Sequence, residues 1–194
     1  MRAILRQDPD VVMVGEMRDT ETAQIGIQSS LTGHLVLSTV HTNNAVAAIT
    51  RLRDMGIESF LLASSLRTII SQRLVRRLCP HCKTEHKPST ESIDIFGLDK
   101  NKSVFSANGC DECNQTGYQG RIAIAECIQI DKTLKDLIHN DASENEISDY
   151  VFKDNQSIDK ASIDLIVSGV TSCEEIIRVN NIKAVSYTHL RAHE

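Results

Sequence analysis

Two pairs of cysteines, each with Cys-x-x-Cys spacing, constrain this chain more than any other feature. The first pair is Cys79 and Cys82, the second is Cys110 and Cys113, and 27 residues lie between the pairs. Four thiolates can enclose Zn²⁺ tetrahedrally, and two such turns are a usual way of bringing them together. Because a closed set of four sulfurs leaves no open coordination position, the spacing predicts a structural zinc site and not a catalytic one.

The alternatives to a metal site are disulfides or free thiols. The N-terminus has no apolar signal region, and no stretch is apolar for the ~20 residues that span a bilayer. We therefore expect a cytoplasmic protein, in which paired cysteines favour metal over disulfides. Unliganded thiols would leave this polar, aromatic-poor segment with little core. Cys127 and Cys173 lack such partners, and we expect them to be buried as small apolar side chains.

Composition limits both the core and the partners. The 194 residues are 41% hydrophobic but only 4% aromatic, with no Trp, so we expect an aliphatic core in one large domain or two small ones. The net charge of −5 argues against a general nucleic-acid binder. A local basic cluster, Arg73, Arg76 and Arg77, is interpreted as the solvated face of an otherwise apolar helix.

Residues 1–78 alternate between strand and helix patterns. Val11–Val14 is a short apolar run that ends at Gly15, which favours a strand buried on both faces of a parallel sheet. The order of elements is strand, helix, strand, helix, helix, and the last helix is expected from Glu58 to Leu78. This order predicts a doubly wound α/β domain.

The composition changes at Cys79, and three further segments follow. Residues 79–130 carry Pro, Gly, the paired cysteines and short strands, one of them around Ile122 and Ile124, and are interpreted as a zinc module. Residues 131–183 are expected to be helical, with Ser-x-x-Glu capping-box signatures at Ser143 and Ser172. Residues 184–194, AVSYTHLRAHE, fit no preceding pattern and are interpreted as a non-native extension.

Glu16 comes directly after the first strand, at an edge where α/β folds place their ligands. A carboxylate there can polarise the water that attacks a γ-phosphate, or help to hold the Mg²⁺ that accompanies it. The simpler alternative is an exposed acid at a strand end. Asp10 lies at the opposite end of the same strand and is expected to be structural.

Two histidines bracket the second strand. His41 follows it at the edge that carries Glu16, where an imidazole could sense a γ-phosphate or orient the attacking water. His34 precedes the strand and is interpreted as a structural side chain.

Two motifs resemble those of the ATPases of the type II secretion and type IV pilus superfamily. One is LRQDPDVVMVGEMRD, with Met17 where Ile is usual, and the other is the histidine-box segment GHLVLSTVHTNNA. The likeness extends from Met1 to about Val179, and is greatest for the type II branch. It includes the four cysteines and the stretch Thr116–Arg121 that follows them.

The resemblance implies a RecA-like motor domain with ATP and Mg²⁺ as ligands. It implies catalytic roles for Glu16 and His41, and nucleotide contacts for Gly15, Arg18 and Thr42. It also implies a homo-hexamer that works with an inner-membrane platform and cytoplasmic proteins of the secretion machine to drive pseudopilus assembly. No GxxxxGK[ST] phosphate loop occurs in the chain, so we expect the C-terminal part of a larger ATPase, inactive by itself.

Two alternatives remain open at the level of sequence. A type IV pilus assembly ATPase would share every motif named above and would differ only in the machine that it serves. A non-enzymatic zinc-ribbon binding module is the alternative from a different class. The net charge and the lack of exposed aromatics near the cysteine turns count against nucleic acid as its partner.

Overall fold

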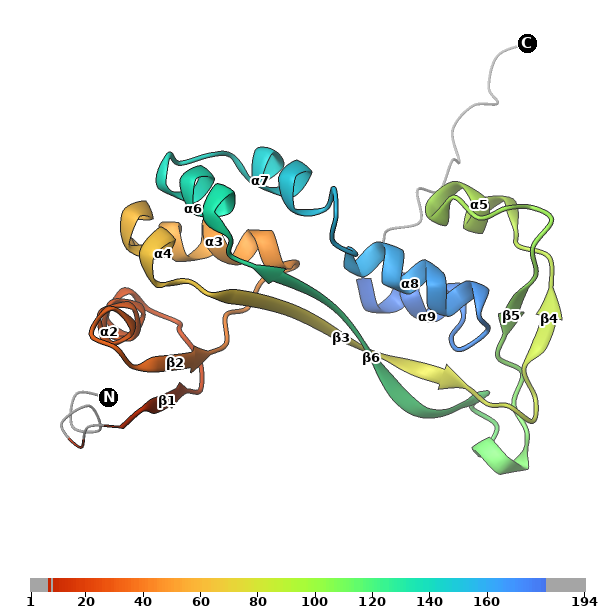
Figure 1. Cartoon of the computed structure of the whole chain (residues 1–194). Helices are drawn as coiled ribbons and strands as arrows, with labels where there is room; N and C mark the ends of the chain where they lie inside the picture. The colour runs from red at the N-terminus through yellow and green to blue at the C-terminus, as the bar shows by residue number, and fades with distance from the viewer. Residues whose placement is uncertain (1–6, 8, 181–194) are drawn as a thin grey trace, which may run out of the picture. The chain divides into compact units, whose positions relative to one another are not determined.

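The computed structural model describes residues 7 and 9–180 (Figure 1). The interpreted extension 184–194 lies outside the described residues. The chain divides into two compact units, and each is assembled from two separate stretches. Unit 1 comprises Met1–Ser71 and Glu126–Ser157, and unit 2 comprises Gln72–Ala125 and Ile158–Glu194. The segment boundaries expected from composition stay a prediction, and the compact units divide the chain differently.

Unit 1 contains a parallel pair of strands joined by a helix. Strand β1 (Val11–Val14) pairs with β2 (Leu35–Ser38), and Val11 lies opposite Leu35 in this register. Helix α2 (Thr20–Leu31) connects them, and its first turn is capped by Asp19, whose carboxylate accepts a hydrogen bond from the Thr22 amide at 2.8 Å. The predicted strand–helix–strand arrangement is confirmed.

The prediction that both faces of this sheet are buried is wrong for this chain. Val12 and Val14 are buried, whereas Val11 is 53% and Met13 is 75% exposed. Leu35 and Leu37, which pair with Val11 and Met13, are also about half exposed. Helix α2 contacts β2, and in Figure 1 it lies on one side of the strand pair. The described residues therefore leave an apolar sheet face open to solvent.

Four further helices complete unit 1, and their core is aliphatic as predicted. They are α3 (Ala45–Asp54), α4 (Ser59–Ser65), α6 (Lys132–His139) and α7 (Glu144–Val151). Helix α4 contacts α2 and α6, and α3 contacts α7. The buried side chains that they share include Ile27, Val46, Ile49, Leu52, Leu62, Ile128, Leu134, Ile138 and Ile147. The guanidinium of Arg53 donates to the carbonyls of Ile138 and Ala142, each at 2.9 Å, and so joins α3 to the end of α6.

The predicted helix from Glu58 to Leu78 is wrong beyond Ser65. The chain leaves the helical conformation at Leu66 (ψ 135°), and Thr68–Leu78 forms strand β3. This strand pairs with β6 (Tyr118–Gln129), and both strands contribute residues to both units. The apolar residues had matched helical spacing, but burial alternates with the two-residue period of a strand over the first half of β3. The basic cluster Arg73, Arg76 and Arg77 consequently lies on a strand, not on a helix face.

Unit 2 contains a small antiparallel pair of strands. Strand β4 (Thr84–His86) pairs with β5 (Val104–Ser106), and α5 (Thr90–Phe96) lies between them in sequence. Helices α8 (Ile158–Val167) and α9 (Cys173–Asn180) both contact β5. Their shared core includes Val75, Phe96, Leu98, Val104, Ile124, Ile166 and Ile176. The expected helical C-terminal region and the strand through Ile122 and Ile124 are confirmed.

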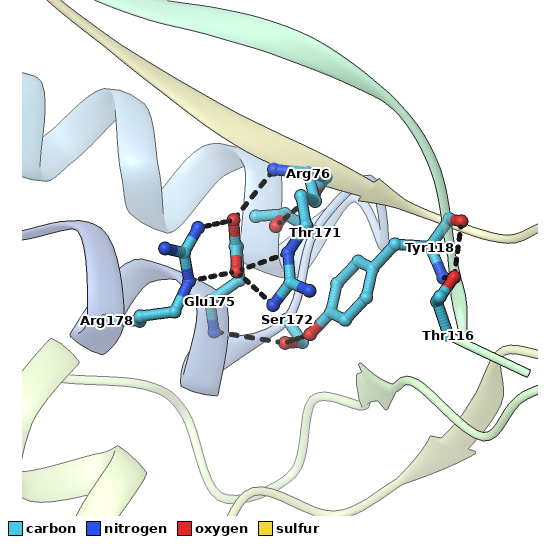
Figure 2. Close-up of polar contacts among 7 residues, drawn as sticks. All are labelled: Arg76, Thr116, Tyr118, Thr171, Ser172, Glu175 and Arg178. Carbon is cyan, nitrogen blue, oxygen red and sulfur yellow. Dashed lines mark hydrogen bonds and ion pairs between the residues drawn. The ribbon is translucent and has the colours of Figure 1, made fainter.

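A buried carboxylate, Glu175, organises the polar part of unit 2 (Figure 2). It accepts hydrogen bonds from the guanidinium of Arg76 at 2.7 Å and from that of Arg178 at 2.6 Å. The Arg76 guanidinium also lies 3.9 Å from the ring centroid of Tyr118, whose hydroxyl is 2.8 Å from Ser172 Oγ. These contacts tie α9 to β3 and to the start of β6.

The two predicted capping boxes differ in the structure. The box at Ser143 is confirmed, because Glu146 and Ser143 bond to each other's backbone amides. Ser172 Oγ accepts from the Glu175 amide at 3.2 Å, but the Glu175 side chain turns to the arginines instead of returning to Ser172. Only half of the second box is therefore formed.

The two cysteines outside the Cys-x-x-Cys pairs also differ. Cys173 is buried as predicted, but Cys127 is exposed, so that prediction is wrong. Cys127 lies on β6 between buried Glu126 and buried Ile128, and the alternation of a strand turns it outward.

Within the described residues, no helix is long and apolar enough to cross a bilayer.

The Glu175 contacts predict an acid-sensitive unit 2. Burial by itself would raise the pKa of Glu175, but the hydrogen bonds from Arg178 and Arg76 outweigh it and lower the pKa to about 2. Since the folded-state pKa lies below the ordinary value of 4.5, the ionised group stabilises unit 2 at higher pH, and this stabilisation is lost as pH falls from 4.5 towards 2.

We expect the urea midpoint of the wild-type chain to fall more steeply over this pH range than that of Glu175→Gln. The substitution should also lower the midpoint at neutral pH, because it removes the counter-charge of two arginines. Glu174→Gln, at the exposed neighbouring position, is the matched control and should behave as wild type. Equal pH dependence of the Glu175→Gln variant and the wild type would contradict the prediction.

Candidate hydrolytic edge and metal centre

The carboxyl ends of β1 and β2 bring Glu16 and His41 into contact. His41 Nε2 lies 2.9 Å from Glu16 Oε1, and Arg18 Nε donates to Glu16 Oε2 at 2.6 Å. The parallel register explains this contact, since it places the residues that follow the two strands at one edge. The His41 side chain is 88% exposed and that of Glu16 19%. The prediction that these two side chains share an edge is confirmed.

The backbone on both sides of Glu16 is held by one residue of the neighbouring strand end. The Thr39 hydroxyl donates to the Gly15 carbonyl at 2.7 Å, and the Met17 amide donates to the Thr39 carbonyl at 3.0 Å. Met17 is buried against α2 at Gly26, where a Cβ would lie only 2.5 Å from the Met17 methyl carbon. Glu16 thus projects from a segment that is fixed before and after it.

The loop after His41 is fixed by the start of α3. The Thr42 hydroxyl donates to the Asn44 carbonyl at 2.9 Å, and Asn44 Oδ1 accepts from the Ala47 amide at 2.7 Å. The Ala45 amide donates to the carboxylate of Glu126 at 2.6 Å, from β6 and 81 residues away. The positive end of a helix favours a buried carboxylate at this place.

Sequence reasoning missed both Thr39 and Glu126. Glu126 had one available signal, because it is the only charged residue in the apolar run from Ile122 to Ile128. A charged residue in an apolar run is expected either to be exposed or to be buried together with a partner. Glu126 is only 2% exposed, so the second expectation applies. Thr39 had no signal beyond its place in the histidine-box pattern.

The remaining predicted site residues have more ordinary surroundings. His34 Nδ1 lies 3.0 Å from the Ser29 carbonyl at the end of α2, which confirms its structural reading. Gly15 has open space where a Cβ would be, so packing does not require glycine there. The nucleotide contacts assigned to Gly15, Arg18 and Thr42, and the catalytic roles of Glu16 and His41, stay predictions.

The four paired cysteines form one compact cluster in unit 2. All four Sγ atoms lie within 4.8 Å of one another, and three pairs are separated by 3.7 to 3.9 Å. These distances exclude disulfides, whose sulfurs lie about 2.05 Å apart. They fit a cation instead, because four sulfurs at ~2.3 Å from a central Zn²⁺ are about 3.8 Å from each other.

The surroundings of the cluster favour the thiolate form of Cys113 and oppose that of Cys110. Backbone amides of Gly109, Cys110 and Gly117 donate to the sulfurs of Cys82 and Cys113 at 3.1 to 3.3 Å. Burial opposes ionisation of Cys113, but the amides of Cys110 and Gly117 lower its pKa to about 6. Burial and hydrogen bonds with neighbouring thiols raise the pKa of Cys110 to about 12. A divalent cation among the four sulfurs would favour loss of the remaining protons.

Two glycines flank the second cysteine turn and allow its geometry. Gly109 and Gly117 have φ values of 114° and 75°, in the region that disfavours residues with a Cβ. A Cβ would lie 2.8 Å from the Gln115 carbonyl oxygen at Gly109, and 2.6 Å from Ala107 Cβ at Gly117. The close approach of the two chain segments that flank the Cys110–Cys113 turn therefore requires glycine at both positions.

The sequence of this chain matches a known protein family. A family model described as "Type II/IV secretion system protein" matches residues 1–178 of the chain. The chain belongs to this family.

Curated relatives agree with the family assignment. The chain is 51% identical over 181 residues to "Type II secretion system ATPase E" of Vibrio cholerae, and the match covers 92% of this chain. It is 44% identical over 184 residues to "Type IV pilus assembly ATPase TfpB" of Acinetobacter baylyi. The matches cover 36% and 32% of those two proteins, so the chain spans about a third of their length.

Solved structures agree with the fold. The pilus retraction motor PilT with bound ADP superposes with a TM-score of 0.64 at 25% identity, and the match covers 91% of this chain and 41% of PilT. The ATPase DotB of Legionella pneumophila gives a TM-score of 0.61 at 21% identity. The predicted fold, part of an α/β ATPase with a four-cysteine module and a helical C-terminus, is confirmed.

The cysteine geometry predicts one Zn²⁺ per chain. Cys110→Ser should lose the metal and make residues 79–125 sensitive to protease, because metal binding worth ~10–16 kcal/mol would be weakened in a region with a small core. Cys127→Ser, at the exposed cysteine outside the cluster, is the matched control and should keep the metal. Elemental analysis after purification without chelator measures this. A wild-type chain that is protease-resistant and free of metal would contradict the prediction.

The buried Glu126 predicts a second stability effect, in unit 1. Glu126→Ala should destabilise unit 1 by about 1–3 kcal/mol, because it leaves the Ala45 amide buried without that acceptor. Glu126→Gln keeps an acceptor oxygen and should cost clearly less. Denaturant unfolding of the two variants beside wild type provides the comparison. An alanine variant as stable as the glutamine variant would show that the bond to Ala45 contributes little.

Proposed function

We propose that this chain supplies the hydrolytic edge and the metal module of an ATP-driven motor for type II protein secretion. The observation that carries the proposal is the Glu16–His41 contact at the carboxyl ends of two parallel strands. Such an edge is where α/β folds bind nucleotides. The family membership supports ATP as the substrate.

In this proposal Glu16 polarises the water that attacks the γ-phosphate. One carboxylate oxygen contacts His41 and the other contacts Arg18, so the orientation of the carboxylate is set from both sides. His41 is largely exposed, which leaves its ring free to respond to a phosphate group that approaches the edge. Mg²⁺ bound with ATP would neutralise phosphate charge, and Gly15, Arg18 and Thr42 lie where they could contact that nucleotide.

The open face of the sheet supports a role within a larger assembly. A two-stranded sheet is marginal alone, and this one exposes Val11, Met13, Leu35 and Leu37 on one face. The chain also spans about a third of the length of its curated relatives. We propose that the complete protein covers this face, that it works as a cytoplasmic hexamer at an inner-membrane platform, and that its four cysteines hold a structural Zn²⁺.

The type II machine is favoured over the type IV pilus machine by a specific observation. Identity is 51% to the secretion ATPase of Vibrio cholerae and 44% to the pilus assembly ATPase of Acinetobacter baylyi, over almost the same stretch. A non-enzymatic zinc-binding module is the remaining alternative, and the loss of hydrolysis in the following experiment separates it from a motor.

The test uses a chimera in which residues 1–178 replace the matching segment of the Vibrio cholerae protein. Glu16→Gln in this chimera should lower ATP turnover on the order of 100-fold or more, because an amide cannot accept a proton from water. Nucleotide binding should persist, and His41→Ala should lower turnover less. Glu144→Gln, an exposed acid on α7, should leave turnover unchanged. Near-parental turnover in Glu16→Gln would remove Glu16 from this role.

A further inference from the structure

Thr39 holds both strand ends that meet at the candidate site. Its hydroxyl donates to the Gly15 carbonyl at 2.7 Å, immediately before Glu16. Its own carbonyl accepts from the Met17 amide at 3.0 Å, immediately after Glu16. His41, which contacts the Glu16 carboxylate, follows Thr39 by two residues. A single residue therefore fixes the backbone beside one partner of the contact and precedes the other partner in the same loop.

The hydroxyl bond restrains the most adaptable point of this edge. Gly15 has no side chain to pack, and open space surrounds the position of its missing Cβ. A glycine directly before Glu16 would allow the carboxylate to take several positions. The Met17 amide bond needs only a backbone carbonyl and any residue at 39 would supply it, whereas the bond to Gly15 needs a hydroxyl.

The Thr39 hydroxyl is expected to contribute little to the stability of the fold. Thr39 is exposed, and the segment from β1 to Met17 is already anchored by the buried side chains of Val12, Val14 and Met17. A neutral hydrogen bond at a solvated position stabilises a protein only weakly. Position, by contrast, matters strongly for a carboxylate that must orient water, because displacements of about 1 Å can cost large factors in rate.

We propose that Thr39 is a positioning residue that sets the distance between Glu16 and His41 through its hydroxyl bond to Gly15. The proposal deepens the hydrolytic role proposed above and rests on it only for the kinetic consequence. The geometric consequence, that the Glu16–His41 contact depends on the Thr39 hydroxyl, can be tested without hydrolysis.

The first test observes the His41 ring in the 194-residue chain by NMR. His41→Asn identifies its resonances among those of seven histidines. Glu16→Gln gives the direction in which these resonances move when the Glu16–His41 contact is weakened. Thr39→Val, which removes the hydroxyl and keeps the shape, should shift the His41 resonances in the same direction, and Thr39→Ser should leave them as in wild type. Thr39→Ala replaces Thr39→Val if the valine variant does not fold.

Two results of this test would overturn the proposal. One is that Thr39→Val leaves the His41 resonances unchanged while Glu16→Gln moves them. The other is that Glu16→Gln itself moves nothing, because no contact would then exist in solution for Thr39 to set.

The second test measures hydrolysis in the Vibrio cholerae chimera. Thr39→Val should lower kcat about ten-fold or more with KM nearly unchanged, and Thr39→Ser should restore most of kcat. A parental kcat in Thr39→Val, beside a strong defect in Glu16→Gln, would overturn the positioning role and leave the proposed function intact. If Glu16→Gln has no defect, the proposed function fails instead, and the NMR comparison still decides the geometry.

Discussion

The parallel pairing of β1 with β2 is the constraint on which the candidate hydrolytic edge depends. Parallel strands end at the same edge, so residues separated by a whole helix in sequence become neighbours. Here the pairing brings Glu16 and His41 to 2.9 Å, and it brings Thr39 beside Gly15. A shift of one residue in the register would reverse the facing of every side chain in β2 and separate the two groups. Val36 of β2 packs against the hydrophobic core and opposes such a shift.

Unit 2 depends on two polar clusters as well as on apolar burial. The cysteine cluster closes the two turns, and the Glu175 cluster joins α9 to β3. The two clusters are connected through residues 117 and 118. The Gly117 amide donates a hydrogen bond to Cys113 Sγ. The ring of the next residue, Tyr118, stacks against the Arg76 guanidinium, and its hydroxyl lies within hydrogen-bond distance of Ser172 Oγ. Loss of a metal bound by the cysteines would therefore also disturb the contacts of the residues that anchor α9.

The features that were predicted from sequence are those encoded within short stretches. The strand before Glu16, the Ser143 capping box and the cysteine spacing need only neighbouring residues to be read. The error from Glu58 to Leu78 arose because residues 68–78 carry apolar side chains at helical spacing, while pairing with the distant β6 decides their structure. Glu126 and the ion pair of Glu175 with Arg76 were missed for the same reason, since the Ala45 amide lies 81 residues from Glu126 and Arg76 lies 99 residues from Glu175.

The contacts that fix the candidate hydrolytic edge lie entirely within unit 1. In the proposed motor, the residues that orient water would therefore be held separately from those that bind phosphate. Thr39 and the Ala45–Glu126 bond hold the two ends of the loop that carries His41, and none of these contacts needs a nucleotide. The groups that cradle phosphates in such enzymes are a glycine-rich loop and its lysine, a motif that this sequence does not contain. In the proposed motor, this chain would therefore supply a preformed water-orienting side, and the phosphate-binding side would have to meet it across the edge.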